Sequence, residues 1–184
     1  MSAEEITAAF AEASETLAPC IGRPSDSYIQ LMVEALASVL IPIPFDITNG
    51  NADSLLALVS TDLEYQNRFG RTFVVPPQVG IYDVTIPPNA NNRERAEREA
   101  IHDARRTDRA TFDAAVQCVR QFIIDHVEDD WIRTHRHPVF LYERTPCRAL
   151  LQTLRNIATG RQATDRIALL NKMQTFFKKA SGLP

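Results

Sequence analysis

The sequence predicts an all-α protein: a compact bundle of five to seven helices around one core, with a long proline-rich extended loop in the middle. Apolar residues recur at three- and four-residue spacing over most of the 184 residues, which is the periodicity of helices. Serine, threonine or asparagine precedes several of these stretches, as expected of helix N-caps. A hydrophobic content of 45% and a charged content of 23% are those of a globular chain with one well-buried core.

Two helices are predicted near the N-terminus. The first follows the N-cap candidate Ser2 and ends before Pro19, because proline lacks the amide donor that a helix interior needs. The second is capped by Ser25 or Ser27 and continues to Leu40.

The prolines of residues 41–44 favour extended backbone after the second helix. Residues 49–51, Asn-Gly-Asn, predict a turn. A third helix is then expected, capped by Asp53 or Ser54 and closing near Gly70.

The helical pattern stops between Arg71 and Pro88. Two pairs of adjacent prolines there favour extended chain, and a loop of this length is usually functional or disordered. Because it carries apolar side chains, we expect it to be ordered and pinned to the core by Phe73, Val75 and Ile86.

A long helical pattern covers residues 91–126. Its first half, through residue 109, is almost wholly charged, whereas its second half is apolar at helical spacing. The contrast predicts either two helices or one helix that projects from the core. A short helical segment, residues 131–135, follows behind an acidic cap.

Two more helices are expected at the C-terminus. Thr145, followed by a proline, fits an N-cap, and that helix is expected to end at Gly160. A final helix spans residues 164–179. The corresponding domain division is 1–160 for the helical domain and 161–184 for a C-terminal helix.

Charge is distributed unevenly along the chain. Residues 1–64 carry ten acids and one base, residues 65–130 eleven acids and nine bases, and residues 131–184 two acids and ten bases. The acidic and basic ends could fold against each other, bind an anionic partner through the tail, or form the two sides of a head-to-tail contact between copies.

Cysteine usage and the N-terminus bear on the compartment. Cys20, Cys118 and Cys147 lack the paired spacing of a zinc knuckle or redox dithiol, so we expect buried, reduced thiols. The acidic N-terminal residues 2–6 do not fit a signal peptide, and no segment is apolar enough to span a bilayer. We therefore expect a cytoplasmic protein with no membrane partner.

Catalytic motifs are not found: the sequence has no phosphate loop, dinucleotide fingerprint, nucleophile elbow or zinc-protease motif. We expect neither an enzyme nor a cofactor. Residues 133–137 contain His135 and His137, which could contact a metal or RNA, but a purely structural role is the stronger interpretation.

The basic C-terminal segment is the candidate site, for nucleic-acid contact or for self-association. Base-stacking aromatics are sparse there, and Trp131 is expected in the core. The candidate residues are Arg133, Arg136, Arg144, Arg148, Arg155, Lys178 and Lys179.

The order of short motifs resembles the capsid region of copia-like retrotransposon Gag polyproteins over roughly residues 27–160. The matching segments are Ser54–Val59, Tyr65, Phe73–Pro77, Gly80 and Thr85–Pro87, then Ala114–Val127, Trp131–Pro138 and Thr145–Gly160. Departures are Val79 before Gly80, where the family has proline, and Ala158–Thr159, where it has a tyrosine.

The resemblance implies a capsid N-terminal lobe, with residues 161–184 as a linker or the start of a second lobe. It implies a structural protein that forms homo-oligomeric shells enclosing RNA. The chain lacks the zinc knuckle through which such Gag proteins bind RNA, so RNA contacts would be non-specific and electrostatic. The alternative is a nucleic-acid-binding or adaptor module that uses the basic C-terminal segment.

Overall fold

A computed structural model describes residues 1–45, 54–81 and 83–180 of the chain. These residues form six α-helices, two short 3₁₀ helices and no β-sheet, so the all-α prediction is confirmed. The predicted turn at 49–51 and the cap candidate Asp53 lie outside the described residues. The elements are α1 (Ala3–Thr16), α2 (Asp26–Leu40), η1 (Leu55–Leu58), α3 (Asp62–Phe69), α4 (Asn92–His126), α5 (Asp129–Ile132), η2 (Arg133–His135) and α6 (Cys147–Ala180).

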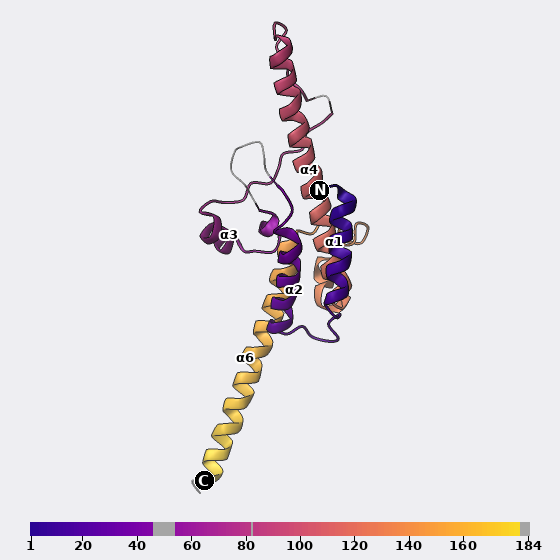
Figure 1. The fold of residues 1–184 in the computed structure, drawn as a ribbon. Helices are drawn as coiled ribbons and strands as arrows, with labels where there is room; N and C mark the ends of the chain where they lie inside the picture. The colour runs from indigo at the N-terminus through magenta and orange to yellow at the C-terminus, as the bar shows by residue number, and fades with distance from the viewer. Residues whose placement is uncertain (46–53, 82, 181–184) are drawn as a thin grey trace.

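The helices form a body from which two long helices project (Figure 1). In the body, α1 and α2 pack beside the second half of α4 and the first half of α6. The first half of α4 and the second half of α6 leave the body in opposite directions. The expected compact bundle therefore describes the body but not these two projections.

The core is built from apolar faces at the predicted helical spacing. Ile6 and Phe10 of α1, Met32 and Leu36 of α2, and Leu154 of α6 are each at most 4% exposed. The core of the body also takes in the second half of α4 and the short helix η1.

The first two helices begin where the sequence predicts. The Ser2 hydroxyl accepts a hydrogen bond from the amide of Glu5, whose carboxylate accepts one from the amide of Ser2, which is a capping box. The Ser25 hydroxyl caps α2 by accepting from the Tyr28 amide at 3.2 Å.

The prediction of one continuous third helix is wrong, because this stretch forms two separate elements, η1 and α3. Ser54 caps η1, and the helical path then breaks at Thr61. Thr61 is the N-cap of α3 and forms a capping box with Glu64. The Thr61 hydroxyl accepts from the Glu64 amide, and the Glu64 carboxylate accepts from the Thr61 amide. Gly70 closes α3 in the left-handed conformation, at φ 69°.

Residues 92–126 form one helix, α4, of 35 residues. Its first buried side chain is His102, and its apolar core contacts begin at Phe112. Of the two alternatives left by the sequence, the structure therefore has the single projecting helix.

The segment between α3 and α4 lies along the projecting half of α4. Side chains of α4 hold its backbone: Arg98 donates to the Thr85 carbonyl at 3.0 Å, and Arg109 donates to the Pro76 carbonyl at 2.7 Å. The expectation that Val75 pins this segment to the core is wrong, because Val75 is 54% exposed. Hydrogen bonds from arginines of α4 to backbone carbonyls hold this part of the segment, where apolar burial was expected.

Phe73 does anchor the start of this segment to the body. Its ring lies 6.0 Å from that of Phe45, 6.1 Å from that of Phe112 and 5.7 Å from that of Tyr65, measured between centroids. Phe73 is half-buried in this cluster and packs against the core. Ile86 is half-buried too, but it is not among the side chains that pack against the core, so the expectation that it pins the segment there is wrong.

The expected helix end at Gly160 is wrong: α6 runs without a break from Cys147 to Ala180. Gly160 does not adopt the positive φ with which a glycine ends a helix. The good helix formers after it, such as Arg161 and Gln162, continue the helix at the modest cost of an internal glycine. The expected division at residue 160 thus falls inside a continuous helix.

Candidate interaction surfaces

The projecting half of α6 exposes large apolar side chains. Between residues 167 and 176, five of them are 47–70% exposed, although they are spaced as core residues would be. They are Ile167, Leu169, Leu170, Met173 and Phe176.

These side chains make α6 amphipathic beyond the body. With 3.6 residues per turn, Leu169, Met173 and Phe176 share one face, and Leu170 borders it. Ala168 and Thr175 occupy the opposite face. An exposed apolar stripe is typical of a surface that contacts another molecule.

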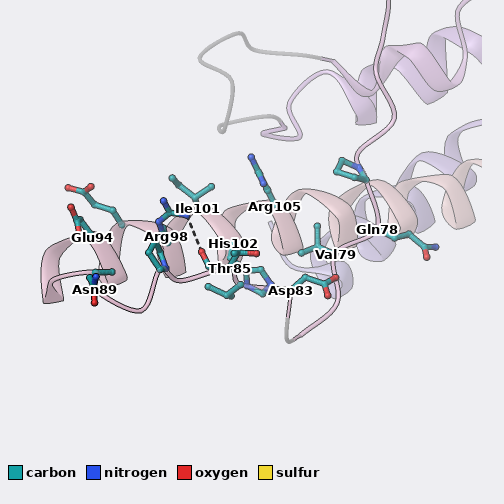
Figure 2. A pocket seen from close by; sticks show the side chains of 15 residues that line it. Gln78, Val79, Asp83, Thr85, Asn89, Glu94, Arg98, Ile101, His102 and Arg105 are labelled. Carbon is teal, nitrogen blue, oxygen red and sulfur yellow. Dashed lines mark hydrogen bonds between the residues drawn. The ribbon is translucent and has the colours of Figure 1, made fainter.

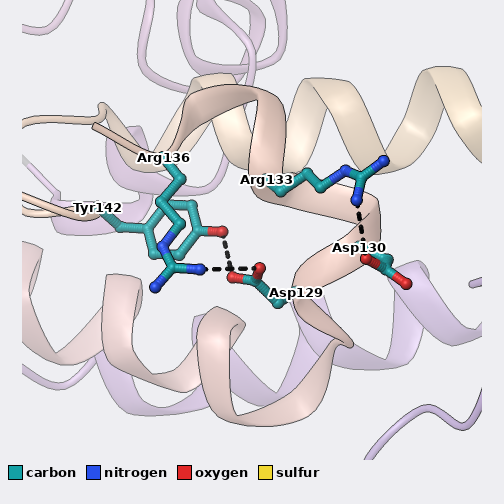
Figure 3. Close-up of polar contacts among 5 residues, drawn as sticks. All are labelled: Asp129, Asp130, Arg133, Arg136 and Tyr142. Atoms are coloured by element: carbon teal, nitrogen blue, oxygen red, sulfur yellow. Dashed lines mark hydrogen bonds and ion pairs between the residues drawn. The ribbon is translucent and has the colours of Figure 1, made fainter. Parts of the chain in front are cut away.

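Arg133 and Arg136 are exposed and form ion pairs with neighbouring acids (Figure 3). Arg133 pairs with Asp130 and Arg136 with Asp129, each at 3.4 Å, and the Tyr142 hydroxyl donates to Asp129 at 2.5 Å. Both pairs are exposed to solvent, so each contributes little to stability, and both guanidinium groups face solvent.

The next three predicted arginines lie in different surroundings. The Arg144 guanidinium stacks over the Phe140 ring, 3.5 Å from its centroid. Arg148 donates to the Ala57 carbonyl and to the Asp62 carboxylate, and Arg155 donates to the Val59 carbonyl at 3.5 Å. Arg148 and Arg155 thus tie α6 to the η1–α3 segment.

Lys178 and Lys179 lie on the last turns of α6, where the structure describes the helix but not their side chains. The predicted site residues are therefore not gathered on one face. Arg133, Arg136 and Arg144 lie on the exposed surface of the α5–α6 region, whereas Arg148 and Arg155 are half-buried against the η1–α3 segment.

The two histidines of residues 133–137 have separate structural partners. His135 Nε2 lies 2.7 Å from the Thr153 hydroxyl of α6. His137 Nδ1 accepts hydrogen bonds from the backbone amides of Val139 and Phe140. Among the described residues, no group of three metal-ligating side chains is found.

The three thiols all have raised pKa values. Burial raises the pKa of Cys147 to about 11 and also raises the pKa values of Cys118 and Cys20. A nucleophilic or redox-active cysteine instead needs a lowered pKa. The expected burial is complete only for Cys147, since Cys20 and Cys118 are half-buried, and all three are free thiols.

A cleft of about 860 Å³ lies between α4 and the segment before it (Figure 2). Arg98 and Arg105 line it together with Glu94 and Asp83. His102, 8% exposed, lies at its base with Nε2 2.9 Å from the Gly80 carbonyl oxygen. Its charges are mixed, and much of its polar lining already holds the loop in place.

A second hollow, of about 360 Å³, lies between α1 and α4. Its base includes Phe10 and Phe122, which are nearly fully buried, together with Cys118. The exposed acids Glu15 and Asp125 lie at its edges. We call this hollow the α1–α4 groove.

Sequence reasoning identified neither the cleft nor the groove. The groove forms where residues far apart in the chain meet: Thr7 of α1 lies 3.8 Å from Cys118 of α4, measured between the hydroxyl oxygen and the sulfur. The cleft depends on how the segment of residues 77–90 folds back along α4, which apolar spacing does not show. The signal that could have pointed to the groove is the charge of α1, which carries four acids and no base.

Comparison of the chain with protein-family models, curated proteins and solved structures finds no match. In the described part of the chain, no helix has both the length and the apolar character needed to cross a membrane. The surfaces above are therefore the basis for the functional argument.

Proposed function

We propose that this chain is a structural protein that self-associates, and that it acts as a capsid subunit like the Gag proteins its sequence resembles. In this proposal α6 is the contact helix, and the assembled shell encloses RNA. The observation that supports it best is the exposed apolar stripe on the projecting half of α6.

The size of the stripe fits a weak, repeated contact. Removing a large apolar side chain such as Leu169 or Met173 from water contributes about 1.5–3 kcal/mol. Association of two molecules costs on the order of 4–15 kcal/mol in lost freedom. A few such side chains only offset a cost of this size, so a single contact is weak, as suits a shell in which many identical contacts act together.

Sedimentation velocity of the full chain, over a range of protein concentrations, tests the contact helix. We expect wild-type association to rise with concentration and the double variant Leu169→Gln with Met173→Gln to stay monomeric, because glutamine keeps the helix but removes the apolar stripe. The matched control, Ala168→Gln with Thr175→Gln on the opposite face, should associate like wild type. A double variant that assembles as well as wild type would contradict the proposal.

Salt provides a second test of the same proposal. The acidic 1–64 and basic 131–184 segments attract each other between copies, and exposed charges are screened within about 8 Å at physiological ionic strength. Association should therefore weaken as salt rises. Equal association at low and high salt would contradict an electrostatic contribution to the contact.

Binding of RNA by the basic segment is the second candidate function. The observation in its favour is the exposure of Arg133, Arg136 and Arg144 on the α5–α6 region. Such dispersed contacts to phosphates predict modest, sequence-independent and steeply salt-dependent affinity. Fluorescence anisotropy with two unrelated RNAs across salt tests this, and tight binding of one RNA at high salt would instead favour a dedicated nucleic-acid module.

A further inference from the structure

We propose that the α1–α4 groove of one copy receives the projecting half of α6 from a second copy. The proposal rests on the self-association proposed above and names the surface that the contact helix meets. It pairs an exposed apolar helix face with a hollow whose base is apolar, so that each would cover the other.

The groove matches the helix in its apolar content. Phe10 and Phe122 form an apolar base, and Ala11 leaves room above it. A volume of about 360 Å³ accommodates one or two large side chains rather than a whole helix. Leu169 or Met173 would insert into the groove while the rest of α6 lies across its edges.

Charge complementarity selects this occupant. Two acids, Glu15 of α1 and Asp125 of α4, are exposed at the edges of the groove, and no base is among the residues that line it. Residues 161–180 of α6 carry five bases and one acid. Lys172 is exposed and borders the apolar stripe, so a docked α6 would bring it to the acidic edge.

The alternative of two α6 helices pairing with each other is disfavoured by the same charges. Residues 161–180 carry five bases and one acid, so both partners would have the same net charge, and like charges across an interface weaken it. A helix docking into its own chain is also disfavoured, because the projecting half of α6 points away from α1 (Figure 1).

The geometry of such assembly differs from that of a two-fold dimer. Each copy offers two different surfaces, its groove and its α6 helix, so the contact is head-to-tail. Repetition of a head-to-tail contact gives a ring if the rotation closes and a filament if it does not. Every interior copy would use both surfaces at once.

A charge-reversal experiment tests the pairing. We expect Glu15→Lys and Lys172→Glu each to weaken self-association about tenfold, as an attractive charge pair becomes a repulsive one. In an equimolar mixture of the two variants, every contact between unlike copies pairs opposite charges again. Association of the mixture should therefore return to near the wild-type level, measured by sedimentation velocity at low salt.

Two further variants separate the groove from general charge effects. Glu12→Lys makes the same charge change on α1 outside the groove lining and should leave association near wild type. Ala11→Trp fills the groove and should abolish association, whereas Ala8→Trp, exposed on the same helix outside the lining, should not.

Failure of this inference is distinguishable from failure of the proposed function. If Leu169→Gln with Met173→Gln is monomeric but Glu15→Lys and Ala11→Trp assemble like wild type, α6 is the contact helix and the groove is not its receptor. If Lys172→Glu mixed with wild type associates more strongly than either alone while Glu15→Lys has no effect, α6 pairs with α6 and the inference is overturned. A wild-type chain that is monomeric at every concentration overturns both.

Discussion

Replacement of Phe73 by alanine should destabilise the protein by about 2–3 kcal/mol. A fully buried phenylalanine costs about 3–5 kcal/mol when truncated, and Phe73 is half-buried, so its transfer energy is smaller. Its ring also contacts those of Phe45, Tyr65 and Phe112, and aromatic pairs contribute about 0.5–1.5 kcal/mol beyond area burial. The midpoint of thermal unfolding should fall by roughly 4–12 °C for a chain of this size.

Urea denaturation followed by circular dichroism measures this change, at a protein concentration low enough to keep the chain monomeric. Val75→Ala is the matched control, because Val75 lies two residues further along the same segment and is 54% exposed. Its effect should stay within about 0.5 kcal/mol. If the two variants unfold at the same urea concentration, the aromatic cluster does not hold the segment, and the role assigned to Phe73 is wrong.

Three further predictions concern buried polar groups. His126 Nε2 lies 3.0 Å from the Leu17 carbonyl oxygen at the end of α1, and Nδ1 lies 2.7 Å from the Phe122 carbonyl oxygen. The buried ring is thus enclosed by backbone acceptors, so His126→Leu should cost about 1–3 kcal/mol in urea denaturation. A loss below about 0.5 kcal/mol would contradict this. Because burial raises the pKa of Cys147 to about 11, iodoacetamide near neutral pH should modify it far more slowly in the folded protein than in urea, and equal rates would refute its burial. Burial and Asp129 raise the pKa of Tyr142 to about 12, so the folded state keeps the phenol proton to higher pH than the unfolded state, and stability should fall between about pH 10 and 12. In Asp129→Asn, a titration followed by phenolate absorbance should give a lower pKa for Tyr142. An unchanged pKa would contradict the contact with Asp129.

Features that depend on residues close together in the sequence could be predicted, whereas those that depend on distant residues could not. The caps Ser2 and Ser25 were predicted because a cap joins residues three positions apart. The break at Thr61 is also local, since its capping box with Glu64 is visible in the sequence, but the apolar spacing across it masked the signal. A glycine ends a helix only where the chain turns, and the residues around Gly160 do not show whether the chain turns there. The structure shows that the helix continues.

The candidate site was predicted only in its electrostatic outline. The opposite charges of residues 1–64 and 131–184 left three alternatives open, of which the contact between copies is the one that we propose. The contact of Arg148 with the η1–α3 segment could not be predicted, because its backbone acceptor, the Ala57 carbonyl, lies 91 positions away. Similarly, helical spacing identified the helix around Met173 but could not show that this half of α6 extends beyond the core.

The opposed projections of α4 and α6 give the monomer unusual hydrodynamics. Helices of 35 and 34 residues are each about 50 Å long at 1.5 Å per residue. A spherical chain of this size would have a radius of gyration of about 16 Å, so X-ray scattering from the monomer should give a clearly larger value. The 20.7 kDa chain will also leave a sizing column early, at the volume of a heavier sphere, and only a measurement of mass itself will distinguish that elongated monomer from a dimer.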